Sequence, residues 1–199
     1  MRSFGASLIL TTLSTTVWAQ STPVEPTFLF GHDIGIASIS ADTNFFFVVS
    51  DRVSDGCWLN ADRALSMAKR EFLDAGYTNI VEEYPFGVIV RMSATGYATS
   101  EYQCAAYVDF DIGITDTDRR TFDLNEWVIV SEKSSFELGA ILTGPKTDMS
   151  DRINDTFAGY IDEFIVNIQQ EKNRLRQAIY EQSVGDEAKA EFLNSVVRQ

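Results

Sequence analysis

Two stretches decide the fold: CWLNADRALSMAKREFLDAG at residues 57–76 and YQCAAYVDFDIGI at residues 102–114. In the first, apolar side chains recur every three or four positions, which predicts an amphipathic helix with a face of mostly alanine. In the second, apolar and polar residues alternate, which predicts a β-strand with one buried face. Each stretch carries one of the two cysteines, so a disulfide between Cys57 and Cys104 would join the start of the helix to the buried face of the strand.

The flanking sequence predicts more strands and one more helix. Residues 45–49 are a continuous apolar run, typical of a covered strand, and residues 81–95 predict a longer strand with an irregular first half. A second hairpin is expected from residues 127–131 and 136–143, and a helix with a wide apolar stripe from about Ser150. We therefore predict an α+β fold: a two-layer sandwich of a mostly antiparallel sheet with two helices on one face, plus a C-terminal helical extension.

The remaining segments are assigned from weaker signals. Residues 115–125 are polar and charged, which predicts a loop, and residues 132–135 are expected to form the turn of the second hairpin. Residues 34–39 alternate partly with small residues, which predicts a weakly paired strand.

The first residues have the pattern of a secretory signal peptide. Arg2 supplies a positive charge, a short apolar stretch follows, and small residues precede a cleavage position near Ala19. No later stretch approaches the roughly 20 apolar residues of a membrane helix, so we expect a soluble periplasmic or extracellular protein. The expected organisation is a signal peptide at 1–19, an extended N-terminal leader at 20–43, an α+β core domain at 44–170 and a helical C-terminal extension at 171–199.

The charge of the chain restricts its partners. Lys and Arg number 16 against 29 Asp and Glu, which gives a net charge of −13 at pH 7. Nucleic acids and anionic membrane surfaces are polyanions, so this charge disfavours both. In the expected compartment two cysteines most simply form one disulfide; two buried free thiols are the alternative.

The sequence lacks the residues of the common catalytic devices. His32 is the one histidine, and there is no G-x-S-x-G motif, no glycine-rich phosphate loop and no zinc-ligand set, so we expect no cofactor. A carboxylate cluster leaves one alternative open, an acid-dependent hydrolase or a calcium-dependent binder, although its spacing does not fit an EF-hand. The cluster consists of Asp109, Asp111, Asp116 and Asp118.

Aromatic residues suggest two alternatives, a sugar- or peptide-binding surface or simple core packing. Alternation places Tyr107 on the outer face of its strand and leaves the others undetermined. The aromatic residues concerned are Trp58, Tyr97, Tyr102, Tyr107 and Trp127.

Our leading functional hypothesis is an exported module without catalytic apparatus that binds a partner or supports assembly of a cell-envelope structure. Residues 171–199 combine many charges with a thin apolar stripe, which suggests helices that dock on their own domain, on a protein partner or on a second copy. The partner-binding candidates are Leu175, Ile179, Phe192 and Val196.

Overall fold

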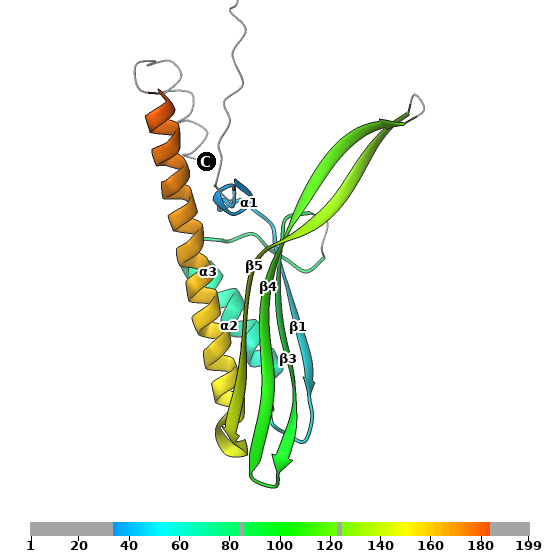
Figure 1. Cartoon of the computed structure of the whole chain (residues 1–199), viewed down its shortest axis with the longest axis vertical. Coiled ribbons are helices and arrows are strands. Elements are labelled where there is room, and N and C mark those ends of the chain that lie inside the picture. Colours follow the sequence, from blue (N-terminus) through cyan, green and yellow to red (C-terminus); the bar gives the residue numbers. More distant parts are fainter. Residues whose placement is uncertain (1–33, 84–85, 123–124, 184–199) are drawn as a thin grey trace, which may run out of the picture.

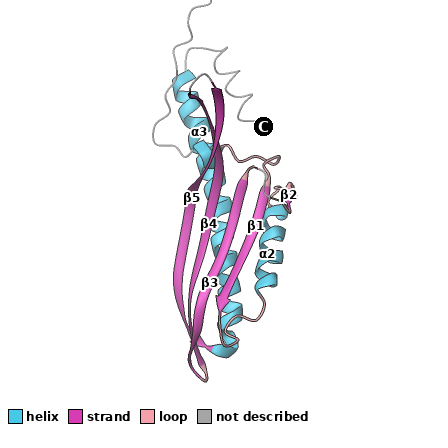
Figure 2. Cartoon of the chain, turned by 90° about the vertical axis from the view of Figure 1, so that its right-hand side faces the viewer, coloured by secondary structure: helices cyan, strands magenta, loops and turns pink. Residues whose placement is uncertain are grey.

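The chain folds into two layers, a five-stranded sheet and a layer of helices on one of its faces (Figures 1 and 2). The computed structural model describes residues 34–83, 86–122 and 125–183. The predicted signal peptide, most of the predicted leader and residues 184–199 lie outside the described residues. The α+β class is confirmed.

The sheet is mixed, with strand order β2-β1-β3-β4-β5. β1 runs parallel to β2 and β3, whereas β3, β4 and β5 pair antiparallel in sequence order. Parallel neighbours need a crossover, and α2 carries the chain back across one face between β1 and its neighbours. The strands are β1 (Phe45–Val53), β2 (Ile80–Val81), β3 (Val88–Ser100), β4 (Gln103–Phe122) and β5 (Asn125–Pro145); the helices are α1 (Ile34–Ala37), α2 (Ala61–Asp74) and α3 (Lys146–Ser183).

α2 forms as its sequence pattern predicts. The side chain of Asn60 accepts a hydrogen bond from the backbone N–H of Arg63 at 3.2 Å and caps the first turn. Ala64, Ala68 and Phe72 form the fully buried face. Two of these three side chains are single methyl groups, so the helix can approach the sheet closely.

The core lies between the sheet and the helices. Alternate residues of β3 and β4 point inward, and their register pairs Val90 with Ile112 and Met92 with Phe110. α3 covers this face with side chains spaced three or four residues apart, which gives it a continuous apolar stripe. The buried residues of that stripe are Met149, Ile153, Phe157, Ile161, Phe164 and Ile168.

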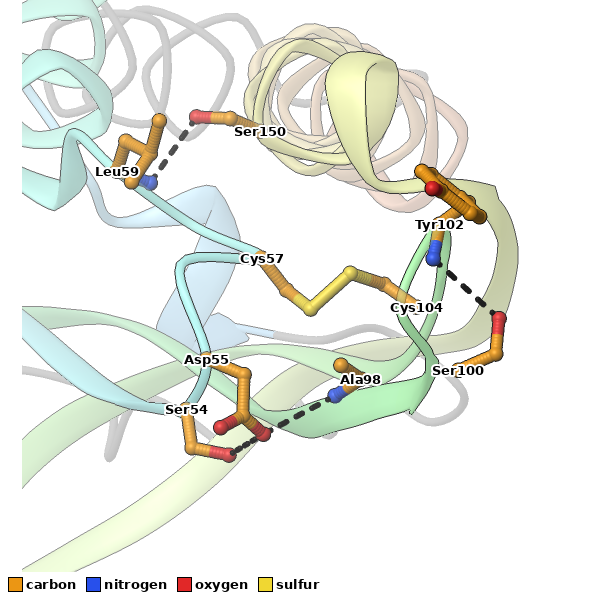
Figure 3. The surroundings of a disulfide bond; sticks show 9 residues. All are labelled: Ser54, Asp55, Cys57, Leu59, Ala98, Ser100, Tyr102, Cys104 and Ser150. Carbon is orange, nitrogen blue, oxygen red and sulfur yellow. Dashed lines mark hydrogen bonds between the residues drawn. A yellow bond between two sulfur atoms is a disulfide. The ribbon is translucent and has the colours of Figure 1, made fainter.

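The predicted disulfide links Cys57, just before α2, to Cys104 near the start of β4 (Figure 3). Their Cα atoms are 6.0 Å apart and both residues are buried. The turn before Cys57 is fastened to β3, because the carboxylate of Asp55 accepts hydrogen bonds from Ser54 Oγ at 2.8 Å and from the backbone N–H of Ala98 at 3.3 Å. These hydrogen bonds lower the pKa of Asp55.

The expected loop at 115–125 and the expected second hairpin were wrong. β4 and β5 form one hairpin of about twenty residues a strand, whose connection at 123–124 lies outside the described residues. The expected turn at 132–135 is a β-bulge: Ile112 pairs with Phe136 and Gly113 with Ser134, which leaves one extra residue on β5. No described residue covers the outer part of this hairpin, so its strands there need no buried face and lack the apolar alternation that marks strands in a sequence.

Two further assignments are corrected at the helices. Ile34–Ala37 forms a short helix that contacts α3 rather than a strand, and it places Ile36 and Ile39 in the core. α3 begins at Lys146, slightly before the expected Ser150, and continues without a break past residue 171 to Ser183. Within the described part of the chain, no helix is both long and apolar enough to cross a membrane.

We predict that the disulfide contributes about 3–4 kcal/mol to the free energy of unfolding, because it closes a loop between residues 47 positions apart. Replacing both residues, Cys57→Ser with Cys104→Ser, should lower the urea midpoint by the corresponding amount. Adding dithiothreitol to this double variant is the control and should change nothing further. Equal midpoints for the two proteins without reductant would contradict the prediction.

Candidate interaction surfaces

The β4–β5 hairpin extends well past the rest of the sheet (Figure 1). β3 pairs with β4 only as far as Ile114, and the backbone N–H of Thr115 bonds to Gly87. Beyond this point, in the part of the chain that the structure describes, β4 and β5 pair only with each other. We call residues 116–122 and 125–131 the arm. Val128 and Val130 on the arm are 56% and 51% exposed, so it presents apolar side chains to solvent.

A network of charged side chains lies at the base of the arm, on the sheet face that the helices leave open. Arg91 Nη1 is 2.7 Å from Asp111 Oδ2, and Arg91 Nη2 forms a second ion pair with Glu132. Ser134 Oγ donates to the other oxygen of Asp111 at 2.6 Å. The network therefore joins β3 and β4 to β5 at the point where the arm leaves the sheet.

The position of Glu132 at the base of the arm depends on Gly113, and the Arg91 side chain that it meets is partly buried. The Glu132 carboxylate lies directly over Gly113, in the space that a β-carbon there would occupy. Burial acts to lower the pKa of Arg91, but hydrogen bonds and charge interactions with Glu132 and Asp111 outweigh it, and the net pKa is raised. Arg91 is therefore a permanent cation that holds two carboxylates together.

The structure separates the aromatic residues that the sequence grouped as one possible binding surface. Trp58 is buried and donates from Nε1 to Asn154 Oδ1 at 3.1 Å, so it belongs to the core. Tyr102 lies beside the start of α3 (Figure 3). Tyr97 and Tyr107 share the open face as diagonal neighbours, since their paired positions are Ala105 and Thr95. The side chain of Trp127 lies outside the described residues.

The predicted carboxylate cluster is divided between the sheet and the arm. Asp109 and Asp111 lie on the open face of β4, and Asp109, as the principal cause, raises the pKa of Tyr107, whose hydroxyl donates to it at 3.5 Å. Asp116 and Asp118 lie on the arm, and their side chains are outside the described residues. Among the described residues, no three His, Cys, Asp or Glu side chains are grouped to hold a metal ion.

The C-terminal part of α3 carries two of the four predicted partner-binding residues. Leu175 and Ile179 lie one turn apart and are half-buried, whereas Phe192 and Val196 lie outside the described residues. Two other apolar side chains of α3 are more exposed, Val166 at 52% and Tyr180 at 66%. Figure 1 shows that this end of α3 and the arm extend toward the same end of the molecule but diverge from each other.

An open pocket of about 520 Å³ lies at the opposite end, next to the disulfide. Leu59 and Tyr102 give it an apolar lining and are 79% and 70% exposed, while Lys146 and Ser150 come from the first turns of α3. The hydroxyl of Ser150 accepts a hydrogen bond from the backbone N–H of Leu59 at 3.3 Å, so it is engaged within the fold.

Comparisons with known proteins give no family. No protein-family model matches the chain, and no curated protein matches it. Among solved structures, the chain is similar to a dodecamer of a PelC variant from Paraburkholderia phytofirmans, with 12% sequence identity and a TM-score of 0.35. The match covers 64% of this chain and 86% of that chain. A likeness at this level carries no argument about function.

Sequence reasoning missed the arm and the role of Arg91. The expected strand at 127–131 begins with four consecutive apolar residues, which are a signal for an unusual strand environment. Arg91 gave no signal, because its two partners lie 20 and 41 positions further along the chain and meet it only through strand register.

We predict that Arg91→Met lowers the free energy of unfolding by about 1–2 kcal/mol, because it leaves two neighbouring carboxylates without their cation at a partly exposed site. Urea unfolding measures the loss. Arg52→Met, an identical change at an exposed position of β1, is the matched control and should cost much less. Equal losses would show that the network stabilises nothing.

We also predict that calcium does not bind the carboxylate cluster, because both oxygens of Asp111 are engaged by Arg91 and Ser134. Isothermal titration with calcium chloride should give only dilution heats, and the thermal midpoint should not move. A saturable heat that Asp109→Asn abolishes would contradict this prediction and restore the calcium hypothesis.

Proposed function

We propose that the chain is an exported module without catalytic apparatus that binds a protein partner and so supports assembly of a cell-envelope structure. The observation that carries the proposal is the pair of extensions, the arm and the C-terminal part of α3, which reach beyond the two-layer body toward one end of the molecule (Figure 1). Among the described side chains, the buried apolar residues of β4 end at Ile112 and those of α3 end at Ile168, so neither extension is needed to enclose this core.

Export is supported by the chemistry of the two cysteines. A structural disulfide persists in an oxidising compartment and is rare in the cytoplasm. Cys57 and Cys104 are in bonding position and fully enclosed, which suits a permanent link rather than an exchanging one. The signal-peptide pattern of the first nineteen residues supports the same compartment.

A binding role is supported by the apolar side chains on both extensions. Val128 and Val130 on the arm and Tyr180 near the end of α3 are each more than half exposed. A large exposed apolar side chain is common when it stands alone, but several on projecting elements mark an association surface. On α3 the candidates Leu175 and Ile179 add to this surface.

We predict that Leu175→Glu reduces recovery of the partner about tenfold, since a charge at a buried contact costs more than about 1.4 kcal/mol. Tagged full chain would be crosslinked in cells, purified, and its crosslinked partners quantified by mass spectrometry. Gln177→Glu places the same charge on an exposed position of the same helix and is the matched control. An unchanged set of partners in Leu175→Glu, with its thermal midpoint retained, would count against the proposal.

A further inference from the structure

We infer that the arm is an association surface for a second copy of this chain, and that two arms pair edge to edge through β5. This inference rests on the proposed function and specifies one of its partners. It concerns a different surface from Leu175 and Ile179 on α3, so experiments can reject the arm inference and the α3 proposal independently.

The first argument is the state of the strand edges. β5 is the last strand of the sheet along its whole length, and in the arm β4 has also lost its neighbour β3. The described residues therefore place no third strand against either side of the arm. The outward backbone groups of a long edge strand readily pair with a strand from another molecule.

The second argument is the apolar sequence of that edge. Residues 127–130 are Trp-Val-Ile-Val, and the side chains of Val128 and Val130, two positions apart on the same face, are each more than half exposed. A run of four consecutive apolar residues is unusual on a ribbon that no layer covers, unless the run serves a function. A two-stranded ribbon is also only marginally stable by itself, and a wider sheet shelters more of its apolar surface.

The third argument is that the base of the arm is fixed. Arg91 binds Asp111 of β4 and Glu132 of β5 at the point where the arm begins, and Ser134 binds Asp111 as well. The direction of the arm is thereby set before any partner arrives. A preorganised surface loses less conformational entropy when it binds.

A second copy fits this edge better than a lipid surface does. Antiparallel pairing of one segment with itself is symmetric, so the same edge serves both molecules. Centred on Val130, such a pairing sets Trp127 opposite Lys133 and Val128 opposite Glu132, with no like charges facing each other. Insertion into hydrocarbon is disfavoured, because residues 116–120 carry four charges in five positions.

The principal test is sedimentation velocity of the purified full chain, expressed with its own leader, over about a hundredfold range of concentration. We expect a concentration-dependent dimer. Val128→Glu combined with Val130→Glu should raise its dissociation constant at least about tenfold, because the charges would be buried against each other. Val166→Glu, a valine of similar exposure on α3, is the control and should leave the constant within about twofold. Circular dichroism confirms that each variant is folded.

A second test examines the register. Val130→Cys should form a disulfide between two copies under mild oxidation, visible on a non-reducing gel, because the proposed symmetry axis passes this position. Val166→Cys is the matched control and should remain uncrosslinked. Cys57 and Cys104 are buried in their own disulfide and do not compete.

Several results would overturn the inference. A monomer at every concentration would do so, as would equal crosslinking of the two cysteine variants. A monomer that co-sediments with phosphatidylcholine vesicles only when Val128 and Val130 are intact would replace it with a membrane-binding role. If the chain is monomeric but still captures a Leu175-dependent partner, this inference fails and the proposed function stands. If the dimer forms and no Leu175-dependent partner is captured, the proposed binding role of α3 is rejected and the inference about the arm stands.

Discussion

The antiparallel pairing of β4 with β5 supports both parts of the molecule. From Gln103 opposite Pro145, the two strands form the edge of the covered sheet, and they continue as the arm to Phe122 opposite Asn125. Within the sheet, Phe110 is buried in the core and Phe136 packs against it. Beyond the sheet the same hydrogen-bond ladder continues, and none of the described residues forms a core beneath it. The same β4–β5 ladder therefore runs from the sheet that the helices cover into the arm.

The change occurs at the Arg91 network and at the β-bulge beside it. A bulge increases local twist and redirects a strand, and here it adds a residue to β5 close to the start of β3. Glu132 then crosses over Gly113 to reach Arg91. The polar network lies on the open face of the sheet, opposite core residues such as Val90 and Ile112. Electrostatic contacts there hold the direction of the hairpin.

The elements with one buried face were predictable from the sequence. α2 and the first half of β4 each show a single clear periodicity. Cys57 lies just before the helix and Cys104 on the buried face of the strand, so the disulfide followed from this pattern and from the expected compartment. The arm was not predictable in this way, because none of the described residues covers it and its sequence has no period of two. α1 is too short for a helical period to emerge. The contacts of Arg91 depend on strand register, which a single sequence does not specify.

The disulfide and the arm lie at opposite poles of β4. Cys104 and Thr115 are separated by about 36 Å at roughly 3.3 Å per residue. Reducing the disulfide loosens the end of the molecule where α2 and α3 begin. The Arg91 network at the other end of β4 keeps its own contacts. The redox state of the surroundings thus affects the free energy of unfolding of the two-layer body, independently of the direction in which the hairpin points. A molecule built in this way gains stability when its disulfide forms, without altering the shape that it offers to its neighbours.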